Sequence, residues 1–143
     1  MEDLFKNLAK VCTEYCKYIQ KNKESGNRGL YDRLKRYVDR SFSNPNFSVK
    51  LVAAEFNISQ SYASRFFKDQ AGQAISDYVA MLRMKKAKAL LKETNKTVAD
   101  IAMETGYGDL STFYRKFKSC ESMSPSDYRE LSKNIGMGMR KKE

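Results

Sequence analysis

The sequence contains no histidine, which removes from its 143 residues the commonest general base and the commonest metal ligand of proteins. It contains three cysteines, Cys12, Cys16 and Cys120, an odd number that matches no disulfide framework and agrees with a reducing compartment. Neither a phosphate-binding glycine loop nor a nucleophile paired with a base is found. These absences argue against an enzyme and predict a protein without a metal ion or another cofactor.

Long hydrophobic runs are missing as well. No apolar segment approaches the roughly 18 residues that a membrane span needs. The first residues show neither the basic region nor the small-residue cleavage pattern of a signal peptide. No segment alternates apolar and polar residues as a half-buried strand does. The chain is therefore expected to be an all-α, cytoplasmic protein that makes no contact with a membrane.

Basic side chains are what the sequence has in excess. The 27 lysines and arginines outnumber the 17 acidic residues, for a net charge of +10, and hydrophobic residues make up 41%, enough for a core. The surplus is concentrated in residues 29–93, where 12 basic side chains stand against 6 acidic ones. Such a surplus favours a polyanionic partner, nucleic acid first and an anionic membrane second. A basic surface that is only solvated fits the total equally well.

Apolar residues recur with a helical period along the whole chain. A polar, glycine-containing break is expected at 24–29, and a turn with a proline at 43–46. Ser48, Ser59 and Thr97 are the expected N-caps of short helices, and Gly72 is expected to stop one. The predicted helices span about residues 3–23, 30 to the turn at 43–46, 49–56, 60–71, 74–93, 98–105 and 109–120, and a last one starts at Pro125.

Two segments of the chain repeat each other. Residues 48–57 match residues 97–106 at an offset of 49, and residues 65–78 match residues 115–128 at an offset of 50. One residue is therefore inserted in the second turn, and the register is otherwise kept. Each copy consists of a helix, a turn of three or four residues and a second helix, which is the helix-turn-helix arrangement.

The second helix of each copy combines an apolar face with a polar one. Hydroxyl groups around a central arginine suit a major groove, because arginine binds guanine through two hydrogen bonds and hydroxyls reach bases or phosphates. An ordinary solvated helix face would have the same residues without a partner, but the occurrence of this polar face in two copies in register favours binding to a major groove. The residues expected inside are Ala63, Phe66 and Phe67, then Leu110, Phe113 and Phe117. Those expected outside are Gln60, Ser61, Ser64, Arg65 and Lys68, then Ser111, Thr112, Arg115, Lys116 and Lys118.

The second copy resembles the signature of the AraC/XylS family of bacterial transcription regulators. The first copy, residues 51–78, is similar in a looser pattern, and the resemblance extends over about residues 30–132. The sequence departs from the family at Ser122, where glycine is usual, and at Gly108, a second glycine in the turn. The matching residues are Asp100-Ile101-Ala102, Gly106-Tyr107, Ser111, Phe113, Arg115, Phe117-Lys118, Pro125 and Tyr128-Arg129.

The resemblance implies a seven-helix DNA-binding domain at residues 29–133. Two helix-turn-helix units, at about 30–72 and 97–133, would be joined by a long linker helix at 74–93. Such a rod, roughly 30 Å long, could hold two recognition helices about one DNA turn apart, so that the binding site is asymmetric. By the resemblance, the base-reading residues are Ser61, Ser64, Arg65, Ser111, Thr112 and Arg115. Phosphate contacts are expected from Ser48, Gln60, Lys68, Thr97, Lys116 and Lys118.

The two ends of the chain lie outside this domain. Residues 1–28 are expected to be a connecting helix and linker of a larger regulator, whose 4-3-4-3 apolar spacing suits a partner helix or the domain itself. Dimerisation is expected through this helix or through a missing domain. Cys12 and Cys16 are expected to be buried as small hydrophobic residues. The basic tail, residues 134–143, is expected to be disordered.

The function predicted from the sequence is sequence-specific binding of double-stranded DNA to regulate transcription, with RNA polymerase as a second partner. The alternative is a helical protein-interaction module whose basic surface binds an acidic partner such as a polymerase subunit. RNA binding is a third interpretation, disfavoured because the deep groove of structured RNA does not admit a helix easily. Competition separates the three, since a specific duplex should displace both RNA and random DNA.

Overall fold

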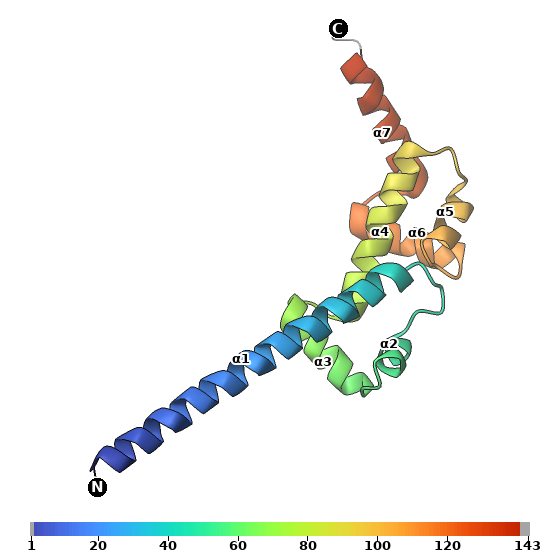
Figure 1. Ribbon diagram of the computed structural model, residues 1–143. Helices are drawn as coiled ribbons and strands as arrows, with labels where there is room; N and C mark the ends of the chain where they lie inside the picture. Colours follow the sequence, from blue (N-terminus) through green and yellow to red (C-terminus); the bar gives the residue numbers. More distant parts are fainter. Residues whose placement is uncertain (1, 141–143) are drawn as a thin grey trace. The chain divides into compact units, whose positions relative to one another are not determined.

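The structure is a computed structural model that describes residues 2–140, with side chains over residues 2–137. The described residues form seven helices joined by turns, without a strand, so the predicted all-α class is confirmed (Figure 1). The helices are α1 (Glu2–Ser41), α2 (Val49–Glu55), α3 (Gln60–Ala71), α4 (Ile75–Glu93), α5 (Val98–Glu104), α6 (Leu110–Glu121) and α7 (Pro125–Arg140).

Two compact units make up the chain, Met1–Arg36 and Tyr37–Glu143. Over its described residues the first unit is the N-terminal part of α1. The second unit begins with the last residues of α1 and contains the helix-turn-helix pairs α2–α3 and α5–α6, the linker helix α4 and α7. Both predicted recognition helices therefore belong to one unit. The division at residue 28 expected from the sequence stays a prediction.

The predicted break at residues 24–29 is wrong, because α1 continues through it as one helix of 40 residues. Glycine in a helix interior costs only about 1 kcal/mol relative to alanine, which weakens a helix without ending it. Gly26 and Gly29 do not have a positive φ, and the segment contains no proline that would remove a backbone donor. Glycine and serine indicate a turn only where a capping conformation is also formed.

The short helices of the second unit begin and end as predicted. The hydroxyls of Ser48, Ser59 and Thr97 accept hydrogen bonds from backbone N–H groups three residues further on, at 3.3, 3.1 and 3.1 Å. Each cap satisfies a donor that the first turn of a helix leaves without a partner. Gly72 ends α3 with a φ of 76°, a left-handed conformation that glycine adopts without steric strain. The last helix starts at Pro125, as expected.

The two recognition helices have the same length and the same type of C-terminus. Both α3 and α6 contain 12 residues, and α6 ends at Ser122 with a φ of 59°. A residue other than glycine pays about 1–2 kcal/mol of strain in this conformation. The serine therefore adopts the backbone shape that suits the glycine usual in the AraC/XylS pattern, and the end of α6 keeps its geometry.

The core of the second unit repeats with the sequence. In α3, Phe67 is fully buried and its ring lies 5.5 Å from that of Tyr78; in α6, Phe117 is fully buried and lies 5.5 Å from Tyr128. These two aromatic pairs occupy equivalent positions of the two copies. The inward positions predicted for Ala63, Phe66, Phe67, Phe113 and Phe117 are confirmed by their burial.

One predicted core residue is on the surface. Leu110 is 41% exposed, so the expectation that it faces inward is wrong. It is the first residue of α6 and matches Gln60, the first residue of α3, which is also exposed. Both residues therefore occupy the same exposed position at the start of a recognition helix.

The predictions for the two ends of the chain need correction. Cys12 and Cys16 are exposed, not buried, because the first unit is a single helix with no second element that could cover them. The tail is helical as far as Arg140, whereas disorder was predicted from residue 134. Helical spacing of apolar residues continues there through Leu131 and Ile135, and no proline follows Pro125. Residues 141–143 lie outside the described part of the chain.

Candidate nucleic-acid interface

The outer face of α3 carries small polar side chains around an arginine. Its other face is buried through Phe66 and Phe67, which fixes the direction in which the polar residues point. None of these polar side chains forms a hydrogen bond or ion pair with another described residue, so all are available to a partner. Gln60, Ser61, Ser64, Arg65 and Lys68 are exposed, as predicted, and Tyr62 is exposed beside them.

The outer face of α6 shares a serine, an arginine and a lysine with that of α3 and differs at other positions. Ser111, Arg115, Lys116 and Lys118 are exposed, whereas Thr112 is half-buried. The N-cap residue is aspartate instead of serine. The Asp109 carboxylate accepts the backbone N–H of Thr112 at 2.7 Å and its hydroxyl at 2.7 Å. The Thr112 hydroxyl is therefore engaged by the cap, and its role at a base stays a prediction.

The Asp109 carboxylate is charged in this arrangement. Hydrogen bonds from the side chain and backbone of Thr112 lower its pKa, and the positive charge of Arg115 acts in the same direction. The N-terminus of a helix favours a negative charge. Asp109 thus occupies the position at the start of α6 where a phosphate could otherwise bind. The phosphate contacts of the second copy are accordingly expected further along the helix.

Sequence reasoning missed an apolar residue on the outer face. Leu110 stands next to Ser111 at the start of α6, where it is 41% exposed. An exposed leucine beside serine can contact the methyl group of thymine in a major groove. The signal was present in the sequence, because the offset of 50 aligns Leu110 with Gln60, which was correctly predicted to face outward.

Three of the five basic residues of α4 form hydrogen bonds or an ion pair within the protein. Arg83 and Lys86 bond to backbone carbonyls, and Lys88 forms an ion pair with Glu121 at 3.0 Å. The hydrogen bond that Lys88 donates to Glu121 raises the pKa of Lys88, whereas burial lowers the pKa of Arg83. Lys85 and Lys92 are exposed.

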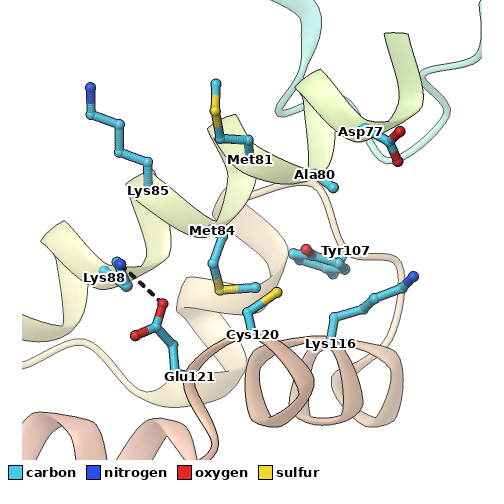
Figure 2. Close-up of a pocket in the computed structure, with 10 residues that line it drawn as sticks. All are labelled: Asp77, Ala80, Met81, Met84, Lys85, Lys88, Tyr107, Lys116, Cys120 and Glu121. Carbon is cyan, nitrogen blue, oxygen red and sulfur yellow. Dashed lines mark hydrogen bonds and ion pairs between the residues drawn. The ribbon is translucent and has the colours of Figure 1, made fainter. Parts of the chain in front are cut away.

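A mostly apolar groove of about 560 Å³ lies between α4 and α6. Figure 2 shows Met84 and Cys120 side by side in it, with Tyr107 toward one end and the ion pair of Lys88 and Glu121 at the other. Burial raises the pKa of Tyr107, so its phenol stays neutral. The groove adjoins the outer face of α6, since Lys116 belongs to both.

Residues 52–131 match the sequence model of the helix-turn-helix domain family. The chain is also 32% identical over 93 residues to the regulatory protein SoxS of Escherichia coli, an alignment that covers 65% of this chain and 86% of SoxS. The chain belongs to the AraC/XylS family. As a member of this family it contains a helix-turn-helix DNA-binding domain, and the family is one of transcription regulators.

Two further similarities place this AraC/XylS domain among its relatives. The Msm operon regulatory protein of Streptococcus mutans is 25% identical over 132 residues, which are 92% of this chain and 47% of that protein. The solved C-terminal domain of AraT, a response regulator from Geobacillus stearothermophilus, is 30% identical with a TM-score of 0.69, covering 71% of this chain and 84% of that one. The chain spans less than half the length of several curated relatives.

Over the described residues, no group of three or more cysteine, aspartate or glutamate side chains is placed to hold a metal ion. No helix in this part of the AraC/XylS chain is both long and apolar enough to span a membrane. The candidate site consists of the polar outer faces of α3 and α6, the second helices of the two helix-turn-helix pairs.

Proposed function

We propose that α3 and α6 enter successive major grooves of one DNA duplex, so that a single chain reads two boxes about one helical turn apart. The observation that carries this proposal is the similarity of the two outer faces. Ser61 and Arg65 of α3 match Ser111 and Arg115 of α6, and all four are exposed. Two similar surfaces in one compact unit suit a DNA duplex, whose major groove returns to the same face after about 10–10.5 base pairs.

Each recognition helix has a distinct set of roles in this proposal. Arg65 and Arg115 bind guanine, since their guanidinium groups can donate two parallel hydrogen bonds to O6 and N7. Ser61, Ser64 and Ser111 donate to base edges, and Thr112 presents its methyl group while its hydroxyl stays on Asp109. Leu110 contacts a thymine methyl. The two boxes would therefore differ, and the site would be asymmetric.

Phosphate contacts would fix the protein on the duplex without reading sequence. The exposed side chains of Lys68 and Lys118 occupy equivalent positions in α3 and α6. Gln60 and Lys116 lie at the edges of the outer faces. Ser48 and Thr97 cap α2 and α5, where the free N–H groups of a helix start can bind a phosphate oxygen.

Selection from random duplexes tests this function directly. The full chain should enrich an asymmetric motif with two boxes about 10 base pairs apart, centre to centre. The selected duplex should displace random DNA and RNA of equal length from the protein. A palindromic motif, a single box or stronger binding of RNA would contradict two-groove binding by one chain.

We also propose that two copies associate through the N-terminal part of α1. Leu4, Leu8, Val11, Tyr15 and Tyr18 follow the spacing of four and three residues that a coiled-coil seam requires, and they are 62–79% exposed. Phe5 and Ile19 widen the stripe and are exposed as well. Aromatic side chains bury about 150–250 Å² each, so the six rings of two copies bring the seam near the roughly 1,000 Å² of a stable interface.

Sedimentation velocity of the full chain tests the dimer. The parent chain should sediment as a dimer, and Leu8→Asp should sediment as a monomer because it places a charge in the seam. Gln20→Asp is the matched control, since it adds the same charge on the opposite side of the helix and should leave the dimer intact. A monomeric parent, or equal dissociation of both variants, would refute this interface.

Two further expectations belong to this proposal. The chain works in the cytoplasm, because that is where bacterial DNA is bound. RNA polymerase is the proposed second partner of the DNA-bound protein. The exposed Leu131 and Ile135 of α7 offer apolar surface to such a protein.

A further inference from the structure

The two helix-turn-helix halves contact each other mainly through other parts of the second unit. The linker helix α4 contacts both α3 and α5, and no contact of comparable extent joins α2 or α3 to α5 or α6 in the part of the chain that the structure describes. A single helix of 19 residues can bend or twist. The relative orientation of α3 and α6 therefore depends on further contacts between the two helix-turn-helix halves.

A second connection is made by two basic residues of α4. Arg83 donates from Nε to the carbonyl oxygen of Phe42 at 2.7 Å and from Nη2 to that of Asn44 at 3.0 Å. Lys86 donates from Nζ to Ser43 Oγ at 3.1 Å and to the Glu104 carbonyl oxygen at 3.0 Å. The turn at 42–44 belongs to the first half and Glu104 ends α5 in the second half. Lys86 therefore bridges the two halves.

The backbone of the second turn completes this connection. A Cβ atom built on Gly106 would lie 2.9 Å from the carbonyl oxygens of Phe42 and Ser43. The turn between α5 and α6 thus packs directly on the backbone of the turn before α2. The Arg83 guanidinium also lies 5.5 Å from the ring centre of Tyr107, the next residue. Only glycine at position 106 permits this approach.

We infer that Arg83, Lys86 and Gly106 form a latch that holds α3 and α6 in one relative orientation, and so sets the spacing between the two DNA boxes that the protein accepts. Three of the four acceptors are main-chain carbonyl oxygens, which cannot turn away as a side chain can, and the fourth is the Ser43 hydroxyl. The donors of the latch are charged, and hydrogen bonds from charged donors are the stronger ones. The effect on box spacing rests on the proposed two-groove binding, whereas the fixed orientation does not.

Spin labels measure the orientation without DNA. Labels would be attached through Ser61→Cys and Ser111→Cys in a chain that also carries Cys12→Ser, Cys16→Ser and Cys120→Ser, since all three native thiols are exposed. The parent should give one narrow distribution of label distances, and Lys86→Met should broaden or shift it. Lys85→Met is the matched control, because Lys85 is an exposed neighbour that bonds to no described residue. Ser43→Ala removes one acceptor and is a milder second variant.

Box spacing measures the consequence on DNA. Inserting one base pair between the selected boxes moves the second box by about 3.4 Å and a tenth of a turn. The parent should lose about tenfold in affinity, the factor expected when a charged hydrogen bond is strained. Lys86→Met should lose about threefold or less, because a freer joint tolerates the shift. Its affinity for a single box should equal that of the parent.

The outcomes separate the two proposals. Label distributions of equal width and position in the parent, Lys86→Met and Ser43→Ala would overturn the latch, whatever the DNA results. A parent that binds both spacings equally would overturn two-groove binding, and the label distances would still decide the fixed orientation. Loss of single-box affinity in folded Lys86→Met would show that Lys86 acts within one half, which also overturns the latch.

Discussion

Gly106→Ala is expected to lower the midpoint of thermal unfolding by about 10–20 °C. Gly106 has a φ of 94°, where a side chain costs about 1–3 kcal/mol. Its new Cβ would also lie 2.9 Å from backbone atoms of residues 42 and 43. Overpacking of this kind adds about 1–3 kcal/mol, so the total cost is about 2–6 kcal/mol, and each 1 kcal/mol corresponds to about 4 °C in a unit slightly longer than 100 residues. Calorimetry or circular dichroism on the full chain gives the midpoint.

Substitutions at two other glycines distinguish backbone strain from steric overlap as causes of the lower unfolding midpoint. Gly72 has a φ of 76° but nothing within 4 Å of its built Cβ, so Gly72→Ala should show only the backbone strain and a smaller decrease. Gly108 has neither a positive φ nor a near neighbour, so Gly108→Ala should leave the midpoint unchanged or raise it slightly. Equal midpoints for Gly106→Ala and Gly72→Ala would show that the two turns do not pack on each other.

The elements of the second unit were predictable because their signals are local. Ser48, Ser59 and Thr97 cap helices through atoms only three residues away, so the sequence around each cap contains the whole interaction. The repeat gives a second indication of whether a position faces the core or the solvent, because each residue can be compared with its match in the other copy. The expectation for Leu110 ignored its match with Gln60, which indicates the outer face.

The latch could not be predicted in the same way. Arg83 and Lys86 reach the turn at 42–44 from about 40 residues further along the chain, and such a pair leaves no periodic pattern in the sequence. In the sequence both residues belong to a row of lysines and arginines on one helix, and nothing distinguishes them from their neighbours. Hydrogen bonds to backbone carbonyls are also difficult to predict. Every residue has a carbonyl group, so the sequence does not show which residue accepts the hydrogen bond.

The errors in α1 have a different physical origin. The break at residues 24–29 was inferred from composition, but glycine and serine weaken a helix by amounts that neighbouring residues can offset. Burial of Cys12 and Cys16 was inferred from the residue type, because cysteine behaves as a small hydrophobic residue, but burial also requires a partner that covers the helix face. Within the first unit no such partner exists, and the proposed dimer would supply one.

Removing both recognition arginines is expected to weaken binding to the selected duplex by about 2–6 kcal/mol, or roughly thirtyfold at the least. Each of Arg65→Ala and Arg115→Ala should cost about 1–3 kcal/mol and relax the base preference in its own box. The two residues lie on different helices, so their effects should add. Fluorescence anisotropy with the selected duplex, and with duplexes changed at one box at a time, measures both affinity and preference.

A variant that loses two positive charges at the phosphate-contacting lysines distinguishes the recognition of bases from electrostatic attraction to the DNA backbone. The double variant Lys68→Ala and Lys118→Ala should weaken binding evenly across sequences and lower the slope of log K against log salt by about 2, since each lost phosphate contact removes about 0.9 from it. The double arginine variant should instead bind random DNA almost as its parent does. Were the arginine pair to lose affinity evenly while keeping its base preference, Arg65 and Arg115 would contact phosphates, and the bases would have to be read by the serines and by Leu110.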